Sequence, residues 1–116
     1  MNLYIKNMVC DRCIMVVRQL LDDDIVGTCG YYRRLDKGEG ELGCVLLPRY
    51  RGQGYMTSAL LLAIAFGKDN IGLKRIWAIT TKPNKKAIHL IEKLNFNKVV
   101  DFSDDEVEYE LRQNDI

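Results

Sequence analysis

Hydrophobic and polar residues follow two different periods along the first half of the chain. Residues 3–7 alternate one by one, which predicts a short strand. Residues 11–21 follow a helical period behind a plausible N-cap at Asp11 and therefore predict a helix. Residues 25–34 and 41–47 are rich in strand-forming side chains, and the turn residues between them predict a hairpin. The apolar stripe of the first helix consists of Cys13, Val17, Leu20 and Leu21.

The second half of the chain predicts two longer helices among three more strands. One helix begins directly after the glycines of the segment RYRGQGYM, and residues 73–81 read as a strand covered on both faces. Pro83 and Asn84 form a helix-start signal, and residues 98–102 and 107–112 predict a closing hairpin. The inward positions of the two helices are Met56, Ala59, Leu60, Ala63, Ile64 and Gly67, then Ala87, Ile91 and Leu94. The second helix turns Lys85, Lys86, His89, Glu92 and Lys93 to water.

This order of elements predicts one mixed α/β domain spanning residues 1–116. The strand–helix–strand unit over residues 41–81 implies a parallel pair with a crossover helix, whereas the hairpins imply antiparallel pairs elsewhere. The expected fold class is therefore a mixed, mostly antiparallel sheet with one parallel pair and flanking helices.

Composition and charge limit the partners and the compartment of the protein, but they do not indicate a reaction. The 116 residues suit one domain, and the formal net charge of +1 gives no general argument for nucleic acid or an anionic membrane as partner. No apolar run reaches the length of a membrane span, and the N-terminus lacks the features of a signal peptide, so we expect a cytosolic protein. In that compartment the cysteines are expected as thiols, with Cys29 and Cys44 as small buried hydrophobes.

The segment RYRGQGYM, residues 49–56, is the first candidate for chemistry. Gly52 and Gly54 lie between a strand and a helix, where bare backbone N–H groups and the helix N-terminus can hold a phosphate. Arg49 and Arg51 can add charge, and Thr57 can add a hydroxyl. Taken alone, the same residues also fit a tight turn beside a solvated basic patch.

The neighbouring segments resemble the GNAT superfamily of N-acetyltransferases. ELGCVLLPRYRGQGYMTSALL resembles the family's fourth strand, its RxxGxG loop and its central helix. GLKRIWAITTKPN, NKKAIHLIEKLNF and VEYEL resemble the fifth strand, the helix headed by an asparagine and the closing strand. The resemblance covers residues 25–116, which would form the acetyl-CoA-binding core.

The resemblance implies acetyl-CoA as the acetyl donor, with its pantetheine arm between two splayed parallel strands. It places Val45, Leu46 and Leu47 along that arm and Asn84 near it or near the sulfur. The pyrophosphate would lie on Arg49, Arg51, Gly52, Gln53, Gly54, Tyr55, Met56 and Thr57.

The implied reaction is direct attack of a neutral amine on the thioester, with an amine acceptor such as a small amine or a protein N-terminus. Glu41 matches a position where some members carry a general base, and it equally fits a surface carboxylate at a strand start. Ile91 stands where many members place a tyrosine that protonates the leaving thiolate, which motivates an alternative, a cofactor-binding scaffold with little catalysis. The acidic loop at residues 103–106 favours a cationic acceptor.

The first residues differ from the family pattern. Met8, Cys10 and Cys13 form an M-x-C-x-x-C motif, so residues 1–21 resemble the start of a heavy-metal-associated domain, and a Cu or Zn site is a further alternative. We expect residues 1–22 to serve as a β-α unit that replaces a strand and two helices of the family. This shortening leaves sheet surface open and predicts a homodimer.

Overall fold

The computed structural model describes residues 3–9, 14–19, 23–32, 37–101 and 103–112. Its strands and helices in chain order are β1 (Leu3–Val9), β2 (Ile14–Gln19), β3 (Ile25–Tyr32), β4 (Glu39–Leu46), α1 (Tyr55–Phe66), β5 (Arg75–Thr81), α2 (Lys85–Lys93), β6 (Asn97–Asp101) and β7 (Glu106–Arg112). A short 3-10 turn (Pro48–Tyr50) precedes α1, and a π turn (Gly67–Ile71) follows it.

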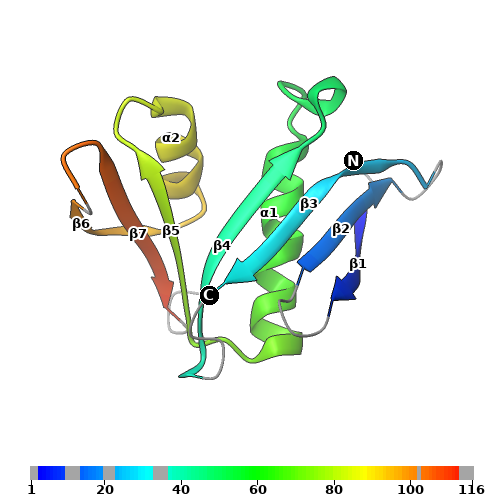
Figure 1. The fold of residues 1–116 in the computed structure, drawn as a ribbon, viewed down its shortest axis with the longest axis horizontal. Coiled ribbons are helices and arrows are strands. Elements are labelled where there is room, and N and C mark those ends of the chain that lie inside the picture. The colour runs from blue at the N-terminus through cyan, green and yellow to red at the C-terminus, as the bar shows by residue number, and fades with distance from the viewer. Residues whose placement is uncertain (1–2, 10–13, 20–22, 33–36, 102, 113–116) are drawn as a thin grey trace.

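The strands form one sheet in the order β1-β2-β3-β4-β5-β7-β6 (Figure 1). All neighbouring pairs are antiparallel except β4 and β5, which α1 connects as a crossover. This confirms the predicted fold class, including the parallel pair and both predicted hairpins.

The predicted helix over residues 11–21 is wrong, because residues 14–19 form strand β2. This strand pairs with β1 on one edge and with β3 on the other. Val16 and Val17 are adjacent and both buried, as in a central strand. Its β-branched residues suit that environment, and pairing on both edges supplies backbone hydrogen bonds that no periodicity reveals. The strand–loop–helix start implied by the heavy-metal resemblance is therefore not formed.

Residues 10–13, between β1 and β2, lie outside the described residues. Cys10 and Cys13 lie there, and the predicted metal site with them. Among the residues that are described, no group of three or more metal-binding side chains comes together.

Both helices pack on the same face of the sheet, with α1 crossing behind β3 and β4 in Figure 1. The Tyr31 hydroxyl on β3 donates to the Ala63 carbonyl of α1 at 2.7 Å. Partly buried Ile91 and Leu94, at or just after the end of α2, pack against the same cluster, as predicted, and Ile88 joins them. No helix of the described residues covers the opposite face of the sheet, which we call the second face. None of the described helices is long and apolar enough to cross a bilayer.

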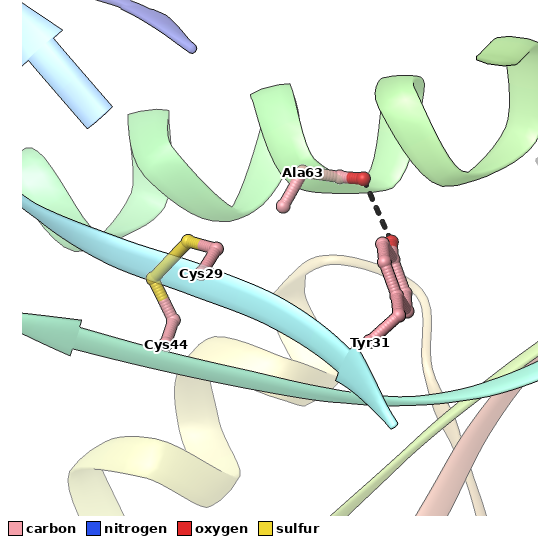
Figure 2. Close-up of a disulfide and its surroundings, with 4 residues drawn as sticks. All are labelled: Cys29, Tyr31, Cys44 and Ala63. Carbon is pink, nitrogen blue, oxygen red and sulfur yellow. Dashed lines mark hydrogen bonds between the residues drawn. A yellow bond between two sulfur atoms is a disulfide. The ribbon is translucent and has the colours of Figure 1, made fainter. Parts of the chain in front are cut away.

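Cys29 and Cys44 form a disulfide across β3 and β4, on the side of the sheet that faces α1 (Figure 2). The prediction that they are separate thiols is wrong. They lie 15 residues apart in sequence but directly opposite each other in the register, with Cα atoms 4.1 Å apart. Narrow pairs in an antiparallel ladder bring opposite Cα atoms to about 4.5 Å, and sequence alone does not give the register.

Candidate functional site

A cleft opens where the parallel strands separate. β4 and β5 pair over three positions, Glu39–Glu41 against Arg75–Trp77, and then diverge (Figure 1). Each strand remains paired on its outer edge, β4 to β3 and β5 to β7. The cleft has a volume of about 440 Å³, and its walls come from β4, α1, β5 and α2. An extended ligand chain could therefore take the place of a missing strand between them.

The backbone that faces this cleft differs in part from the prediction. The Leu47 N–H donates to the Val26 carbonyl at 2.8 Å and is therefore not free for a ligand. Because strand residues point their backbone groups to alternate sides, Val45 also points at β3, while Cys44 and Leu46 point at the cleft. Val45 nevertheless lines the cleft, and the expected place of Val45 and Leu47 along a pantetheine arm stays a prediction.

The glycine loop lies between the end of β4 and the start of α1. Gly52 and Gly54 have φ angles of 72° and 84°, a region that favours glycine, and Gly54 is the N-cap of α1. The first N–H groups of a helix have no partner within it and carry its positive dipole end. Met56, in that first turn, also lines the cleft. The glycine loop therefore leads into a helix N-terminus that borders the cleft, and its role in binding an anion stays a prediction.

Side chains hold the loop from several directions. Arg51 Nε donates to the Leu46 carbonyl at 3.2 Å, and Gln53 Nε2 donates to the Arg49 carbonyl at 2.8 Å. Arg49 lies 3.9 Å from an oxygen of Asp24 and remains exposed. The Tyr55 hydroxyl accepts from Gln19 Nε2 at 2.9 Å, which ties the loop to β2. These contacts fix the loop and keep two guanidinium groups beside it.

Asn84 is the N-cap of α2, as the sequence predicts. Its Oδ1 accepts from the Ala87 N–H at 3.3 Å, and the residue lines the cleft between β4 and β5. Ile91 lines the same cleft, so the position where the resemblance expects an acid carries an apolar side chain. Tyr109 is buried, and its hydroxyl donates to Glu92 at 3.0 Å.

Glu41 directly precedes Leu42, the first residue of β4 that lines the cleft at its narrow end, and does not line the cleft itself. It is the last residue of β4 that pairs with β5, and its partner there is Trp77. Its side chain is half-buried, and one carboxylate oxygen is inaccessible to solvent. The register places it on the second face of the sheet, so it borders the narrow end without entering the helix-covered core.

An ionic cluster on the second face was not found by sequence reasoning. Arg75 contacts Glu108 at 2.6 Å, Glu110 at 2.5 Å and Glu39 at 3.5 Å, and its guanidinium lies 5.1 Å from the Trp77 ring centre. The cluster lines a hollow of about 610 Å³. Three strands supply these residues, so only the β4–β5–β7 register brings them together.

The charges of this cluster shift the pKa values of Arg75 and Glu110. Burial alone would lower the pKa of Arg75, but hydrogen bonds and charge from Glu110 and Glu108 outweigh it and raise that pKa. Burial raises the pKa of Glu110, yet hydrogen bonds from Arg75 and Arg112 outweigh this effect and hold it below its usual value. Arg75 and Glu110 are therefore held in their charged forms.

Comparison with known proteins agrees with this geometry. The family model described as "Acetyltransferase (GNAT) domain" matches residues 4–97. Spermidine N(1)-acetyltransferase of Escherichia coli K12 is 37% identical over 57 residues, which cover 49% of this chain and 31% of that protein. The uncharacterized N-acetyltransferase p20 of Bacillus licheniformis is 32% identical over 90 residues, which cover 76% of this chain and 49% of that protein.

Solved structures show the same fold at low identity. Spermidine N-acetyltransferase from Vibrio cholerae, in complex with CoA and spermine, has a TM-score of 0.84 at 17% identity and is covered over 67% of its length by 90% of this chain. A dodecameric structure of the Vibrio cholerae enzyme gives 0.81 at 18% identity, covering 89% of this chain and 66% of that one.

The chain spans 31% and 49% of the length of these two curated relatives. Within that span, the sheet order, the splayed pair and the glycine loop occur together with a family match over most of the chain. The chain therefore belongs to the GNAT acetyltransferase family.

Proposed function

We propose that this protein transfers the acetyl group of acetyl-CoA to a primary amine by direct attack. The observation that carries the proposal is the cleft between β4 and β5, with the glycine loop and the α1 N-terminus beside it. The pyrophosphate would bind the N–H groups of residues 52–57 beside Arg49 and Arg51. The pantetheine arm would pair with the backbone of Cys44 and Leu46, and Asn84 Nδ2 would donate to it.

Glu41 is the proposed general base at the narrow end of the cleft. A protonated amine must lose a proton before it can attack, and a carboxylate there accepts it directly or through water. Because Ile91 provides no acid, we infer that the leaving CoA thiolate takes its proton from solvent. A scaffold that binds the cofactor without efficient transfer remains the alternative, and turnover separates the two.

The proposed acceptor is a cationic amine of the polyamine class. The relative from Escherichia coli is a spermidine N(1)-acetyltransferase, and the exposed loop beside β7 carries Asp104 and Asp105. The assay combines acetyl-CoA with spermidine or with an N-terminal peptide and detects the acetylated product by mass. Product from spermidine supports the proposal, whereas cofactor binding without any product supports the scaffold.

Cofactor binding has a matched pair of glycine variants as its test. Gly52 and Gly72 have φ angles of 72° and 80°, and a Cβ at either would meet nothing within 4 Å. Val at either position therefore causes similar backbone strain, but only Gly52 lies in the loop. We expect Gly52→Val to weaken acetyl-CoA binding at least about tenfold in calorimetry, equivalent to ~1.4 kcal/mol, and Gly72→Val to leave it unchanged. Equal loss in both variants would contradict the site.

We also propose that two copies of the chain associate through the second face of the sheet. Val45, Val99 and Val100 are 62%, 45% and 49% exposed there, and no described helix covers them. Burying this face between two copies would remove apolar surface from water.

The localisation in the cytosol, with no nucleic-acid partner, rests on the sequence and stays a prediction.

A further inference from the structure

The Cys29–Cys44 disulfide borders the cleft in which the proposed cofactor would lie. Cys44 is on β4 and lines the cleft together with Asn84, Ala78 and Met56. Cys29 is on β3, is 2% exposed and does not line it. Figure 2 shows the bond between the two strands and α1. Cys44 is therefore the half of the bond that borders the cleft, and we expect a reagent in the cleft to meet it before Cys29.

The proposed reaction leaves a thiol in that same cleft. Once the acetyl group has been transferred, the remaining product is CoA with a free sulfhydryl at the end of its pantetheine arm. If the arm pairs with the backbone of Cys44, its thiol lies in the same cavity as the disulfide. Thiol–disulfide exchange needs only a thiolate with access to one sulfur and a leaving thiolate on the other.

We propose that Cys44 is a site of mixed-disulfide formation with CoA, and that Cys29 is its resolving partner. A CoA thiolate attacks the Cys44 sulfur, an S–S bond forms between them, and the Cys29–Cys44 bond breaks. The electron pair leaves on Cys29, which takes up a proton. A second CoA thiolate then attacks the CoA sulfur, releases CoA disulfide and leaves Cys44 as a thiolate. Overall, the protein disulfide is reduced and two CoA thiols are oxidised.

The same intermediate forms in reverse. In the reduced protein, the Cys44 thiolate attacks CoA disulfide, forms an S–S bond to one CoA and releases the other CoA as a thiolate. The Cys29 thiolate then attacks Cys44 and displaces the bound CoA as a thiolate, which restores the Cys29–Cys44 bond. A CoA held on Cys44 would occupy the cleft and block acetyl-CoA. Acetyl transfer would thus respond to the ratio of CoA to CoA disulfide. This inference rests on the proposed cofactor site.

The test traps the intermediate by removing the resolving partner. Cys29→Ser is prepared together with Cys10→Ser and Cys13→Ser, so that Cys44 is the remaining cysteine, and is treated with CoA disulfide. We expect intact mass without reductant to rise by one CoA, with the adduct on the peptide that contains Cys44. The matched control carries Cys44→Ser with Cys10→Ser and Cys13→Ser and keeps Cys29. Its remaining cysteine is buried and should gain no adduct.

Selectivity distinguishes a cofactor-directed reaction from simple exposure. CoA disulfide should modify Cys44 at least about tenfold faster than oxidised glutathione, because binding raises its local concentration. Acetyl-CoA should protect Cys44, and Gly52→Val should remove the advantage of CoA over glutathione. Equal rates with both disulfides, or no protection, would overturn the inference.

Failure of this inference and failure of the proposed function give different results. If calorimetry shows acetyl-CoA binding but Cys44 gains no adduct, the inference is wrong and the cofactor site stands. If acetyl-CoA does not bind, both are wrong. Should Cys29→Ser fail to fold by circular dichroism, the oxidised wild-type protein serves instead. Its disulfide should then be reduced at least about tenfold faster by CoA than by glutathione, and equal rates would overturn the inference.

Discussion

Asn84 shows how one side chain can serve the fold and the proposed site together. Its Oδ1 caps α2 by accepting from Ala87, while the residue also lines the cleft. Oδ1 can therefore cap the helix while Nδ2 donates to a ligand in the cleft. The sequence predicted the cap from the Pro83–Asn84 pair, but only the position of α2 beside β4 and β5 puts the side chain at the cleft.

Two substitutions at Asn84 should separate these roles. Asn84→Asp keeps an accepting oxygen and removes the donor, so stability should be retained while acetyl-CoA binding weakens. Asn84→Ala also removes the cap and should lower the free energy of unfolding by about 1 kcal/mol. Urea denaturation and calorimetry measure the two effects, and unchanged acetyl-CoA affinity in Asn84→Asp would contradict the role in binding.

Glu41 should affect turnover more than binding. Glu41→Gln removes the proposed proton acceptor, so we expect kcat to fall about 100-fold or more and the acid limb of its pH profile to disappear. The dissociation constant of acetyl-CoA should not change. Glu39→Gln, on the same strand face two residues earlier, is the matched control and should keep both the rate and the profile. Equal turnover in the wild type and in Glu41→Gln would show that Glu41 is a surface carboxylate and not the general base.

Glu110 should make stability depend on pH. Its pKa is lowered in the folded state, so its contribution is fully present above the pKa of the unfolded carboxyl group. That contribution is lost as the pH falls through the lower folded value. Glu110→Gln should therefore be less stable than the wild type at neutral pH, with the difference shrinking in acid. Urea midpoints at several pH values measure it, with Glu106→Gln on the same strand as control.

At the scale of elements, β2 shows why hydrophobic period alone misleads in a short segment. Six residues hold less than two helical turns, and their apolar positions fit a helical stripe as well as a strand buried on both faces. Pairing with β1 and β3 decides between them, because a central strand satisfies its backbone groups on both edges. The longer stripes of α1 and α2 were predicted correctly.

The contact between α1 and β3 is a second element-scale test. A Cβ at Gly67, directly after α1, would lie 2.6 Å from the Tyr31 hydroxyl oxygen and 2.7 Å from its ring carbon Cζ. Because Tyr31 is fully buried, the ring has little room to move. Gly67→Ala should lower the free energy of unfolding by about 1–3 kcal/mol. Lys68→Ala, at the exposed neighbour, should change it by less than about 0.5 kcal/mol in the same urea titration.

At the scale of the whole molecule, one face of the sheet carries both helices and the other carries none of the described ones. Light scattering should give the mass of a dimer if the second face is buried between two copies. Val45→Lys places a charge on that face and should give a monomer. Leu61→Lys, at a 53% exposed position on α1, should leave the dimer intact. A wild-type monomer at high concentration would contradict the association.

The sequence by itself determined the elements from residue 25 onward, the parallel crossover and the glycine loop. These features depend on local chemistry: helical spacing, β-branched runs, a capping asparagine and glycines at positions of positive φ. Asn95 follows the same logic, since it lies just after the C-cap of α2 with a φ of 73°, a conformation that glycine and asparagine adopt most readily.

Only the tertiary structure decided which distant residues meet. Strand register paired Cys29 with Cys44, surrounded Arg75 with three glutamates and turned the Leu47 N–H away from the cleft. The same register converted residues 14–19 from an expected helix into a central strand. Register depends on pairing between segments far apart in sequence, and shifting it by one residue reverses every side chain. Local patterns cannot specify it, so these parts of the site emerged only in the folded sheet.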